Sequence, residues 1–427
     1  MNIDNIYALF LKHPLITTDS RNCPEGSLFF ALKGDSFNGN LFARDAIQKG
    51  CSYAFVDEKE FADDKNIFYV PGSLEALQQL ARKHRETLGI PVIGITGTNG
   101  KTTTKELIAS VLQQKYRVLY TQGNLNNHIG VPLTLLKLTK EDELAVVEMG
   151  ANHQGEIKEL ANIALPDYGL ITNVGKAHLE GFGSFEGVIK TKGELYDFLR
   201  EHHKKAFINQ DNEILRSISA GLDKITYGTS NAYDVKGEIV SSEPFLSVHW
   251  NKHVIHTNLI GGYNFENILA AIAIGSYFEV PADKIVKALE TYTPQNNRSQ
   301  FKETEKNRLI IDAYNANPTS MKASLSNFLQ MSFPNKIVIL GDMKELGEQS
   351  EEEHRAIVEL LLDSSLKDAF LIGPCFKQVI SKTSSSFHTY NDVDEFLIWL
   401  QQNPIQHAMV LIKGSNSMRL IKVVDFL

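Results

Sequence analysis

The feature that most constrains the fold is a buried strand, a glycine-rich turn and a helix over residues 92–112, VIGITGTNGKTTTKELIASVL. Gly97 and Gly100 allow the backbone to turn tightly, so that successive N–H groups point inward. The helix that follows presents its positive N-terminal end to the same point. We therefore expect a phosphate cradle in which Lys101 reaches the outer phosphates and the Thr102 hydroxyl reaches a magnesium ion.

The turn departs from the strict GxxxxGK[ST] pattern, because Ile95 stands where its first glycine would be. A glycine-rich turn that binds no ligand is the alternative interpretation. The lysine, the two threonines and the strand–turn–helix context together favour nucleotide binding.

A second component of the phosphate site is expected at the tip of a neighbouring strand. The apolar run in LAVVEMGAN (144–152) ends at Glu148, whose carboxylate could hold magnesium directly or through water. A glutamate at the end of a strand is more often simply solvated. The assignment of Glu148 to a magnesium site therefore depends on the glycine-rich loop that is expected beside it.

Composition excludes several classes of protein. The chain has 43 basic and 51 acidic residues, a net charge of −8, which weakens any interpretation as a general nucleic-acid binder. Three distant cysteines form no CxxC pair and argue against a disulfide framework or a zinc cage. The N-terminus lacks a basic region before its apolar run, and the apolar segment 268–278 is shorter than the ~20 residues of a membrane helix. We expect a soluble, cytoplasmic protein without nucleic-acid or membrane partners.

The 427 residues correspond to about three domains at ~150 residues each. We place the boundaries in Gly89-Ile90-Pro91 and in 291–300, which gives domains at 1–88, 89–294 and 295–427. A helix is expected from an N-cap at Ser73 to Gly89, and Gly50 is expected to cap the helix before it.

The pattern of elements predicts an α/β protein with mostly parallel sheets. In the central domain, five near-continuous apolar runs read as buried strands: 92–96, 117–121, 144–149, 168–174 and 206–210. Residues 234–260 alternate polar and β-branched side chains and predict a small antiparallel patch, before a helix over 261–278. The third domain repeats the pattern, with strands over 309–314, 336–342, 368–373 and 409–415, as a small doubly wound, Rossmann-like sheet requires.

Five segments in order resemble the Mur ligase family, ATP-dependent enzymes that build the peptidoglycan peptide stem. GTNGKTT (97–103) is similar to the family's nucleotide loop and EMGAN (148–152) to its magnesium-carboxylate segment. The other three are NVGKAHLEGFGS (173–184), KTKGEL (190–195) and GGYNFENILAA (261–271). The resemblance covers essentially the whole chain. It implies an N-terminal UDP-substrate domain, a central P-loop-type ATP-binding domain and a C-terminal, Rossmann-like acceptor domain.

The resemblance also implies a mechanism and a set of site residues. ATP phosphorylates a substrate carboxylate, and an incoming amine attacks the resulting acyl phosphate. Two magnesium sites are implied, with Thr102 and Glu148 at one, and His178 and a carbamylated Lys192 at the other. Lys190 is the competing lysine, and an ordinary surface lysine is the alternative for Lys192. The implied ATP-binding residues are Gly97, Thr98, Asn99, Gly100, Lys101, Thr102, Thr103, Asn264, Asn267, Arg298, Asp312, Tyr314 and Asn315.

Members of the family differ in what they add. YNANPTS (314–320), LGDMKELGEQSEEEHR (340–355) and TQGNLNNHIGVPLTLL (121–136) resemble the member that joins D-alanyl-D-alanine to UDP-N-acetylmuramoyl-tripeptide. No Asp-Asn-Pro-Arg acceptor motif occurs, and the loop reads GKTT where folylpolyglutamate synthases usually read GKGS. The implied substrate residues are Ser20, Arg21, Asn124, Asn126, Asn127, Lys413 and Ser415. Asn40 stands where the family usually has histidine, which puts a role for that position in doubt.

Two alternatives stay open. A ligase of the same family could add a single amino acid instead of a dipeptide. A nucleotide-dependent switch would use the phosphate loop, but it would have no need for His178 or a modified Lys192. We expect a monomer, and the third residue of the acceptor stem cannot be read from the sequence.

Overall fold

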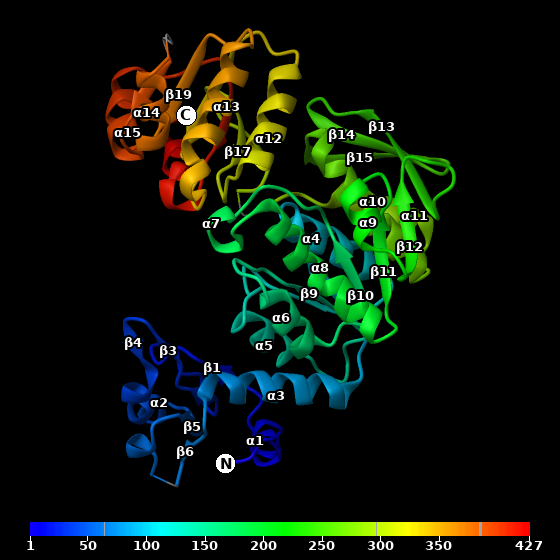
Figure 1. Cartoon of the computed structure of the whole chain (residues 1–427), viewed down its shortest axis with the longest axis vertical. Helices are drawn as coiled ribbons and strands as arrows, with labels where there is room; N and C mark the ends of the chain where they lie inside the picture. Colours follow the sequence, from blue (N-terminus) through cyan, green and yellow to red (C-terminus); the bar gives the residue numbers. More distant parts are fainter. Residues whose placement is uncertain (64, 296, 384–386) are drawn as a thin grey trace.

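Three domains, each built on its own sheet, follow one another along the chain in the computed structural model (Figure 1). The structure describes residues 1–63, 65–295, 297–383 and 387–427. In Figure 1 the N-terminal domain lies at one end of the long axis and the C-terminal domain at the other, with the central domain between them. Among the described residues, no helix combines the length and the apolar character needed to span a bilayer.

The N-terminal domain is a four-stranded parallel sheet in the order β1-β2-β5-β6. Its elements are α1 (Ile3–Phe10), β1 (Ile16–Thr17), β2 (Leu28–Phe30), α2 (Ala43–Gln48), β5 (Tyr53–Val56) and β6 (Ile67–Tyr69). The run 27–34 is divided between two strands. Its first part is β2, and β3 (Lys33–Gly34) then turns back to pair with β4 (Phe37–Asn38).

The central domain holds a nine-stranded sheet in the order β15-β14-β13-β12-β11-β10-β7-β9-β8. The strands are β7 (Val92–Thr96), β8 (Val118–Tyr120), β9 (Leu144–Glu148), β10 (Tyr168–Ile171), β11 (Lys205–Asn209), β12 (Asp223–Gly228), β13 (Val235–Ser241), β14 (Phe245–Trp250) and β15 (His253–Ile260). Strands β7 to β13 all run parallel to one another. Strands β13, β14 and β15 pair antiparallel. The predicted antiparallel patch is therefore confirmed, as an extension of the main sheet.

Helices cover the central sheet on both faces and enclose two large apolar clusters. They are α4 (Lys101–Leu112), α5 (Gly130–Leu135), α6 (Glu156–Ala164), α7 (Leu179–Phe182), α8 (Phe185–Glu201), α9 (Glu213–Ile218), α10 (Phe265–Tyr277) and α11 (Ala282–Thr291). Helix α10 packs on α4, which begins directly after the glycine-rich turn. Burial of this apolar surface on both faces fits the near-continuous apolar strands of the sequence.

The C-terminal domain is a six-stranded sheet in the order β16-β17-β21-β18-β19-β20, parallel except at its β16 edge. Its strands are β16 (Gln300–Glu303), β17 (Arg308–Asp312), β18 (Lys336–Gly341), β19 (Asp368–Ile372), β20 (His388–Tyr390) and β21 (Met409–Lys413). Its helices are α12 (Pro318–Gln330), α13 (Ser350–Leu362), α14 (Pro374–Ser381) and α15 (Val393–Gln402). Each of the three large sheets falls within one predicted domain range, and the exact limits stay a prediction.

Three local predictions need correction. The N-cap of α3 (Ser73–Leu88) is Gly72, because Ser73 is already helical and its hydroxyl donates to the Phe55 carbonyl. The strand predicted as buried at 117–121 is a half-buried edge strand. β10 ends at Ile171, so residues 172–174 are a loop. The left-handed cap at Gly89 (φ 66°) is confirmed, and Gly50 follows the C-cap Lys49 by one residue.

Helix α3 joins the N-terminal domain to the central domain. It packs on α1, α5 and α6, and one apolar cluster runs from α1 through α3 into the central core. Beside this cluster the Arg85 guanidinium donates to the Leu165 carbonyl (3.0 Å) and to Asp167 Oδ2 (2.6 Å). Asp167 also accepts a hydrogen bond from the Val92 amide, so one carboxylate links α3, β7 and the end of α6.

Replacing Arg85 with leucine should weaken this junction. Arg85 is buried, and its loss leaves carbonyl groups at the end of α6 without a donor, so we expect the free energy of unfolding to fall by about 2–3 kcal/mol. Arg82→Leu is the matched control, because Arg82 lies on the same helix in an exposed pair with Glu86 and should change stability by less than about 0.5 kcal/mol. Urea unfolding followed by circular dichroism measures both. Equal midpoints for the two variants would contradict the assignment.

Candidate functional site

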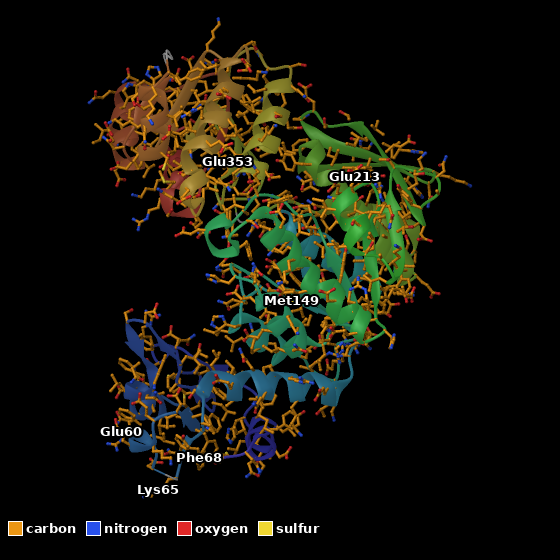
Figure 2. The ribbon with its side chains drawn as sticks, in the orientation of Figure 1. Glu60, Lys65, Phe68, Met149, Glu213 and Glu353 are labelled. Carbon is orange, nitrogen blue, oxygen red and sulfur yellow. The ribbon has the colours of Figure 1, made fainter. Side chains whose placement is uncertain are left out.

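A cavity of about 900 Å³ lies between the central and C-terminal domains. Strands β7, β9 and β10 all end at it, as expected where the carboxyl ends of parallel strands meet. Met149, the residue after Glu148, lies near the middle of the molecule in Figure 2, whereas Glu60, Lys65 and Phe68 mark its N-terminal end. The predicted residues that line the cavity are Thr98, Asn99, Gly100, Lys101, Thr102, Thr103, Asn124, Asn126, Asn127, Glu148, His178, Asn264, Asn267, Arg298, Asp312, Tyr314, Asn315 and Lys413.

Two glycines shape the turn between β7 and α4. Gly97 has φ 143°, and a Cβ there would lie 2.0 Å from Thr172 Oγ1. Gly100 has φ 78°, and a Cβ there would lie 2.8 Å from Asn267 Oδ1. Both positions therefore need glycine for their backbone conformation and for the close approach of a neighbouring side chain.

The turn is held from β10 by hydrogen bonds. The Asn99 amide donates to Asn173 Oδ1 (3.0 Å), and the Thr172 hydroxyl donates to the Asn99 carbonyl (2.6 Å). The Lys101 ammonium donates to the Gly97 carbonyl (2.8 Å) within the turn. Burial lowers the pKa of Lys101, while the Glu148 charge partly opposes this. The turn thus presents a fixed cation at the N-terminus of α4.

Glu148 is a buried carboxylate of the cavity that has several polar partners. The Thr102 hydroxyl donates to its Oε2 (3.0 Å), and Asn126 Nδ2 donates to its Oε1 (2.7 Å). Lys105 Nζ lies 3.7 Å from Glu148 Oε2, although its side chain is only 1% exposed. Burial lowers the pKa of Lys105, and the nearby Glu148 carboxylate opposes that effect. Hydroxyl, carboxylate and amide oxygens here form a donor set that suits Mg²⁺.

Asn264 and Asn267 are buried at the start of α10 and hydrogen bonded. Asn267 Nδ2 donates to Asn264 Oδ1 (2.8 Å), and the Thr104 hydroxyl donates to Asn267 Oδ1 (2.9 Å). Asn264 Nδ2 donates to the Ile260 carbonyl (2.8 Å). These hydrogen bonds tie α10 to α4 beneath the glycine-rich turn.

The structure separates the two candidate lysines of KTKGEL. Lys190 is exposed, whereas Lys192 is 2% exposed, with its Nζ 5.3 Å from the centre of the Phe182 ring. Burial lowers the pKa of Lys192 to about 7, and the charge of Lys101 adds to this effect. His178 is close enough to both lysines for their charges to lower its pKa, which burial lowers most. Lys192 does not itself line the cavity.

The C-terminal domain supplies the opposite wall. The Lys413 ammonium donates to Asp312 Oδ2, and Asp312 Oδ1 accepts from the Ser299 amide (3.2 Å). The Arg298 guanidinium stacks 3.6 Å from the centre of the Tyr314 ring. Its buried Nε has no hydrogen-bond partner among the described residues, so this donor is available to a ligand.

Direct contacts join the two walls. Asn317 Nδ2 donates to Asn99 Oδ1 (2.7 Å), so the glycine-rich turn contacts the start of α12. Lys176 Nζ donates to Glu353 Oε1 (2.7 Å), which is labelled in Figure 2. His178 Nδ1 contacts Glu345 Oε2 of the loop after β18. The cavity is therefore built by both domains together.

Some predicted residues lie elsewhere. Ser20 and Arg21 belong to the N-terminal domain and do not line the cavity; the Arg21 side chain is 88% exposed and pairs with Asp19. Ser415 is buried and accepts a hydrogen bond from the Lys344 amide (3.0 Å) outside the lining. Asn40 is buried, where its amide donates to Asp57 Oδ1 (2.7 Å).

Sequence reasoning did not single out three residues that the structure brings to the site: Lys105, Asn173 and Glu345. The spacing of Lys105, four residues after Lys101 on one helix, could have placed both on the same face. Asn173 lies within a segment that the sequence analysis quoted. Nothing local marks Glu345, because its contact with His178 joins positions far apart in the chain.

Three family models match successive parts of the chain. They are the "Mur ligase family, catalytic domain" over residues 14–85, the "Mur ligase middle domain" over 95–275 and the "Mur ligase, glutamate ligase domain" over 297–416.

The chain is similar to named proteins over nearly its full length. The UDP-N-acetylmuramoyl-tripeptide–D-alanyl-D-alanine ligases of Bacillus subtilis and Escherichia coli are 33% and 32% identical to it, over 96% of this chain and 92% of each relative. A crystal structure of MurF from Acinetobacter baumannii superposes with a TM-score of 0.86 at 32% identity, covering 96% of this chain and 92% of that one. A MurF ligase from Thermotoga maritima in complex with ADP superposes with a TM-score of 0.85 at 28% identity, covering 97% of both chains. The three-domain α/β fold and the sequence identity agree, and the chain belongs to the Mur ligase family.

Proposed function

We propose that the chain is the ATP-dependent ligase that joins D-alanyl-D-alanine to UDP-N-acetylmuramoyl-tripeptide in peptidoglycan precursor synthesis. One observation carries this proposal: the phosphate turn and Glu148 face Asp312, Tyr314 and Lys413 of another domain across a single cavity. A reaction between three substrates needs such a composite site, because each reactant must be held against the other two. The names of the relatives supply the substrates.

ATP is held by the turn and by residues on both walls. The turn offers backbone N–H groups and the positive end of α4 to the phosphates, and Lys101 supplies a cation that can exchange its loop carbonyls for phosphate oxygens. The remaining nucleotide residues are expected to be Thr98, Asn99, Thr103, Asn264, Asn267, Arg298, Asp312, Tyr314 and Asn315. The free Arg298 Nε and the stacked Tyr314 ring favour contacts with the nucleotide.

Two magnesium sites fit the side chains present. Thr102 and Glu148 already lie in contact and offer hard oxygen donors for the first. His178 and Lys192 are the residues for the second. When bound, magnesium neutralises phosphate charge as the acyl phosphate forms.

Lys192 is proposed to be carbamylated. Its amine is buried and forms no ion pair among the described residues, although the charges of Glu156 and Glu194 act on it, and a pKa of about 7 leaves a large share of it uncharged at neutral pH. The uncharged amine can attack CO₂, forming an N–C bond and releasing one proton to water. The product is an anionic oxygen ligand in place of a cation.

The chain's residues then position the reactants. The substrate carboxylate attacks the terminal phosphorus of ATP, and ADP leaves. The amine of the dipeptide attacks the acyl carbon, loses a proton and expels phosphate. Lys101 and the N-terminus of α4 stabilise the negative charge that develops on the transferred group. The cavity walls from two domains limit the access of water to the acyl phosphate.

The substrates are expected to reach the cavity from the two outer domains. Ser20 and Arg21 lie on the N-terminal domain, where the uridine diphosphate end would bind. Asn124, Asn126 and Asn127 line the cavity and would contact the muramoyl or pyrophosphate part. Lys413 and Ser415 are the acceptor candidates of the C-terminal domain. A monomer in the cytoplasm, without nucleic-acid or membrane partners, remains a prediction.

Acceptor specificity is the first test of the proposal. With ATP, magnesium and UDP-N-acetylmuramoyl-tripeptide, we expect phosphate release with D-alanyl-D-alanine and a pentapeptide product by mass spectrometry. Single amino acids should give no release, and omission of the tripeptide is the control. Release with a single amino acid would point to another ligase of the family, and release without any acceptor would support a nucleotide switch.

Lys101→Ala should reduce ligation roughly 100- to 1,000-fold, because a charged group that faces the transferred phosphate is lost. Unfolding should be no easier than in the wild type, since burial already disfavours the Lys101 charge. Lys140→Ala, an exposed lysine on the loop after α5, is the control and should keep full activity. Near-normal turnover of Lys101→Ala in a phosphate-release assay would refute the assignment of the glycine-rich turn to nucleotide binding.

Lys192→Ala should lose activity by about 100-fold and regain part of it with added short carboxylic acids, which can replace the carbamate oxygens. Wild-type protein with ¹³C-labelled CO₂ should show a carbamate carbon signal by NMR that Lys192→Ala lacks. Lys190→Ala is matched to it, two residues away on the same helix but exposed, and should keep both activity and signal. A carbamate signal that persists in Lys192→Ala would argue against this site.

A further inference from the structure

A loop of the C-terminal domain contacts His178, which lines the cavity. Residues 342–347 follow β18 at the carboxyl end of the C-terminal sheet and lie against α7 of the central domain. From this loop Glu345 Oε2 contacts His178 Nδ1. Glu345 Oε1 has no hydrogen-bond partner among the residues that the structure describes, and the side chain is 60% exposed.

Buried side chains hold this loop in place. Asp342 accepts hydrogen bonds from the Cys375 and Phe376 amides (3.1 Å each), and His354 Nε2 accepts from the Met343 amide (3.0 Å). The potential ligand atoms of Asp342, His354 and Cys375 lie within 4.8 Å of one another, as in a metal site. Because the Asp342 oxygens and His354 Nε2 already accept these amides, this cluster clamps the loop and is not a metal site.

The loop also presents Glu345 in a conformation that a glutamate rarely adopts. Its φ is 63°, in the left-handed region, and His178 opposite it has φ 50°. Such backbone conformations persist where the surrounding structure fixes them, and they concentrate at functional sites. Here the hydrogen bonds of Asp342 and His354 fix the backbone of the loop, together with the hydrogen bond from the Lys344 amide to Ser415.

The charges around the Glu345 carboxylate indicate which reactant it can bind. Lys101 and Lys192 both act electrostatically on His178, so this corner of the site gathers cations that suit anionic reactants. The incoming dipeptide differs, because its α-amino group is mostly protonated at pH 7. Glu148 is bound by Thr102 and Asn126, whereas Glu345 keeps an exposed, unpartnered oxygen.

We propose that Glu345 binds the ammonium group of the acceptor dipeptide and so holds its nitrogen at the edge of the cavity, where the nitrogen becomes the nucleophile after it releases one proton to water. The inference rests on the proposed function, and it assigns the acceptor's amine end to a residue of the C-terminal domain. A charge-assisted hydrogen bond from an ammonium to a carboxylate is strong and directional. Glu345 contacts His178, and His178 lines the same cavity as Lys101, so an amine held by Glu345 lies at the edge of the proposed ATP site.

Glu345→Gln tests the proposal while keeping the size and one hydrogen-bond acceptor of the side chain. We expect the KM for D-alanyl-D-alanine to rise about 10- to 100-fold, since a hydrogen bond to a charged group is lost. The KM values for ATP and for the UDP-linked tripeptide should change less than twofold. Glu348→Gln is the matched control: Glu348 lies three residues further on, is exposed and should leave all three values unchanged.

A second measurement separates ammonium binding from a structural effect. N-acetyl-D-alanyl-D-alanine lacks the ammonium, so as an inhibitor it should bind the wild type and Glu345→Gln equally. An unchanged KM for the dipeptide in Glu345→Gln would overturn the proposal, as would a raised magnesium requirement instead, which would make Glu345 part of the metal site. If the wild type proves to use a single amino acid, the proposed function fails. The Glu345 test then still applies with that acceptor, which carries the same ammonium.

Discussion

The close approach of two glycines to side chains of neighbouring strands and helices is the constraint on which the site depends. Gly97 touches Thr172 at the end of β10, and Gly100 touches Asn267 on α10. Each contact leaves no space for a Cβ, so the turn, the sheet and α10 are fixed relative to one another. Because α4 begins at this turn, the direction of its positive end is fixed as well. The position of this positive end therefore follows from backbone packing.

The second half of the site depends on contacts between domains. Asn99 of the turn meets Asn317, Lys176 meets Glu353, and His178 meets Glu345. All three pairs are polar, and Asn317 and Glu353 are buried. Phe245 and Ile260 of the central domain also pack on the apolar core of the C-terminal domain. Polar and apolar contacts together therefore hold the two domains around the cavity.

The sequence predicted the parts of this arrangement that local pattern determines. The apolar runs of β7 and β9 and the turn between β7 and α4 are present in the structure. The prediction failed where a neighbouring segment decides the outcome. Thr172 and Asn173 were included in the predicted strand 168–174, but their side chains donate hydrogen bonds to the Asn99 carbonyl in a loop after β10. The sequence could not choose between Lys190 and Lys192, since only packing buries one of them. The role of Glu345 could not be predicted from local sequence, because its partner His178 lies in another domain.

Four buried or half-buried lysines lie around the cavity, and they differ in the groups that stabilise their charge. Lys105 lies close to Glu148, and Lys413 is paired with Asp312, so both charges have a carboxylate at hand. Lys101 has backbone carbonyls instead, which a phosphate can replace. Lys192 packs on the face of Phe182. The charges of Glu156 and Glu194 partly oppose the effect of burial on its pKa, but neither carboxylate forms an ion pair with it among the described residues. Burial of an ammonium without such a pair favours loss of its proton. Packing therefore favours, at Lys192, the uncharged amine that the proposed carbamylation needs.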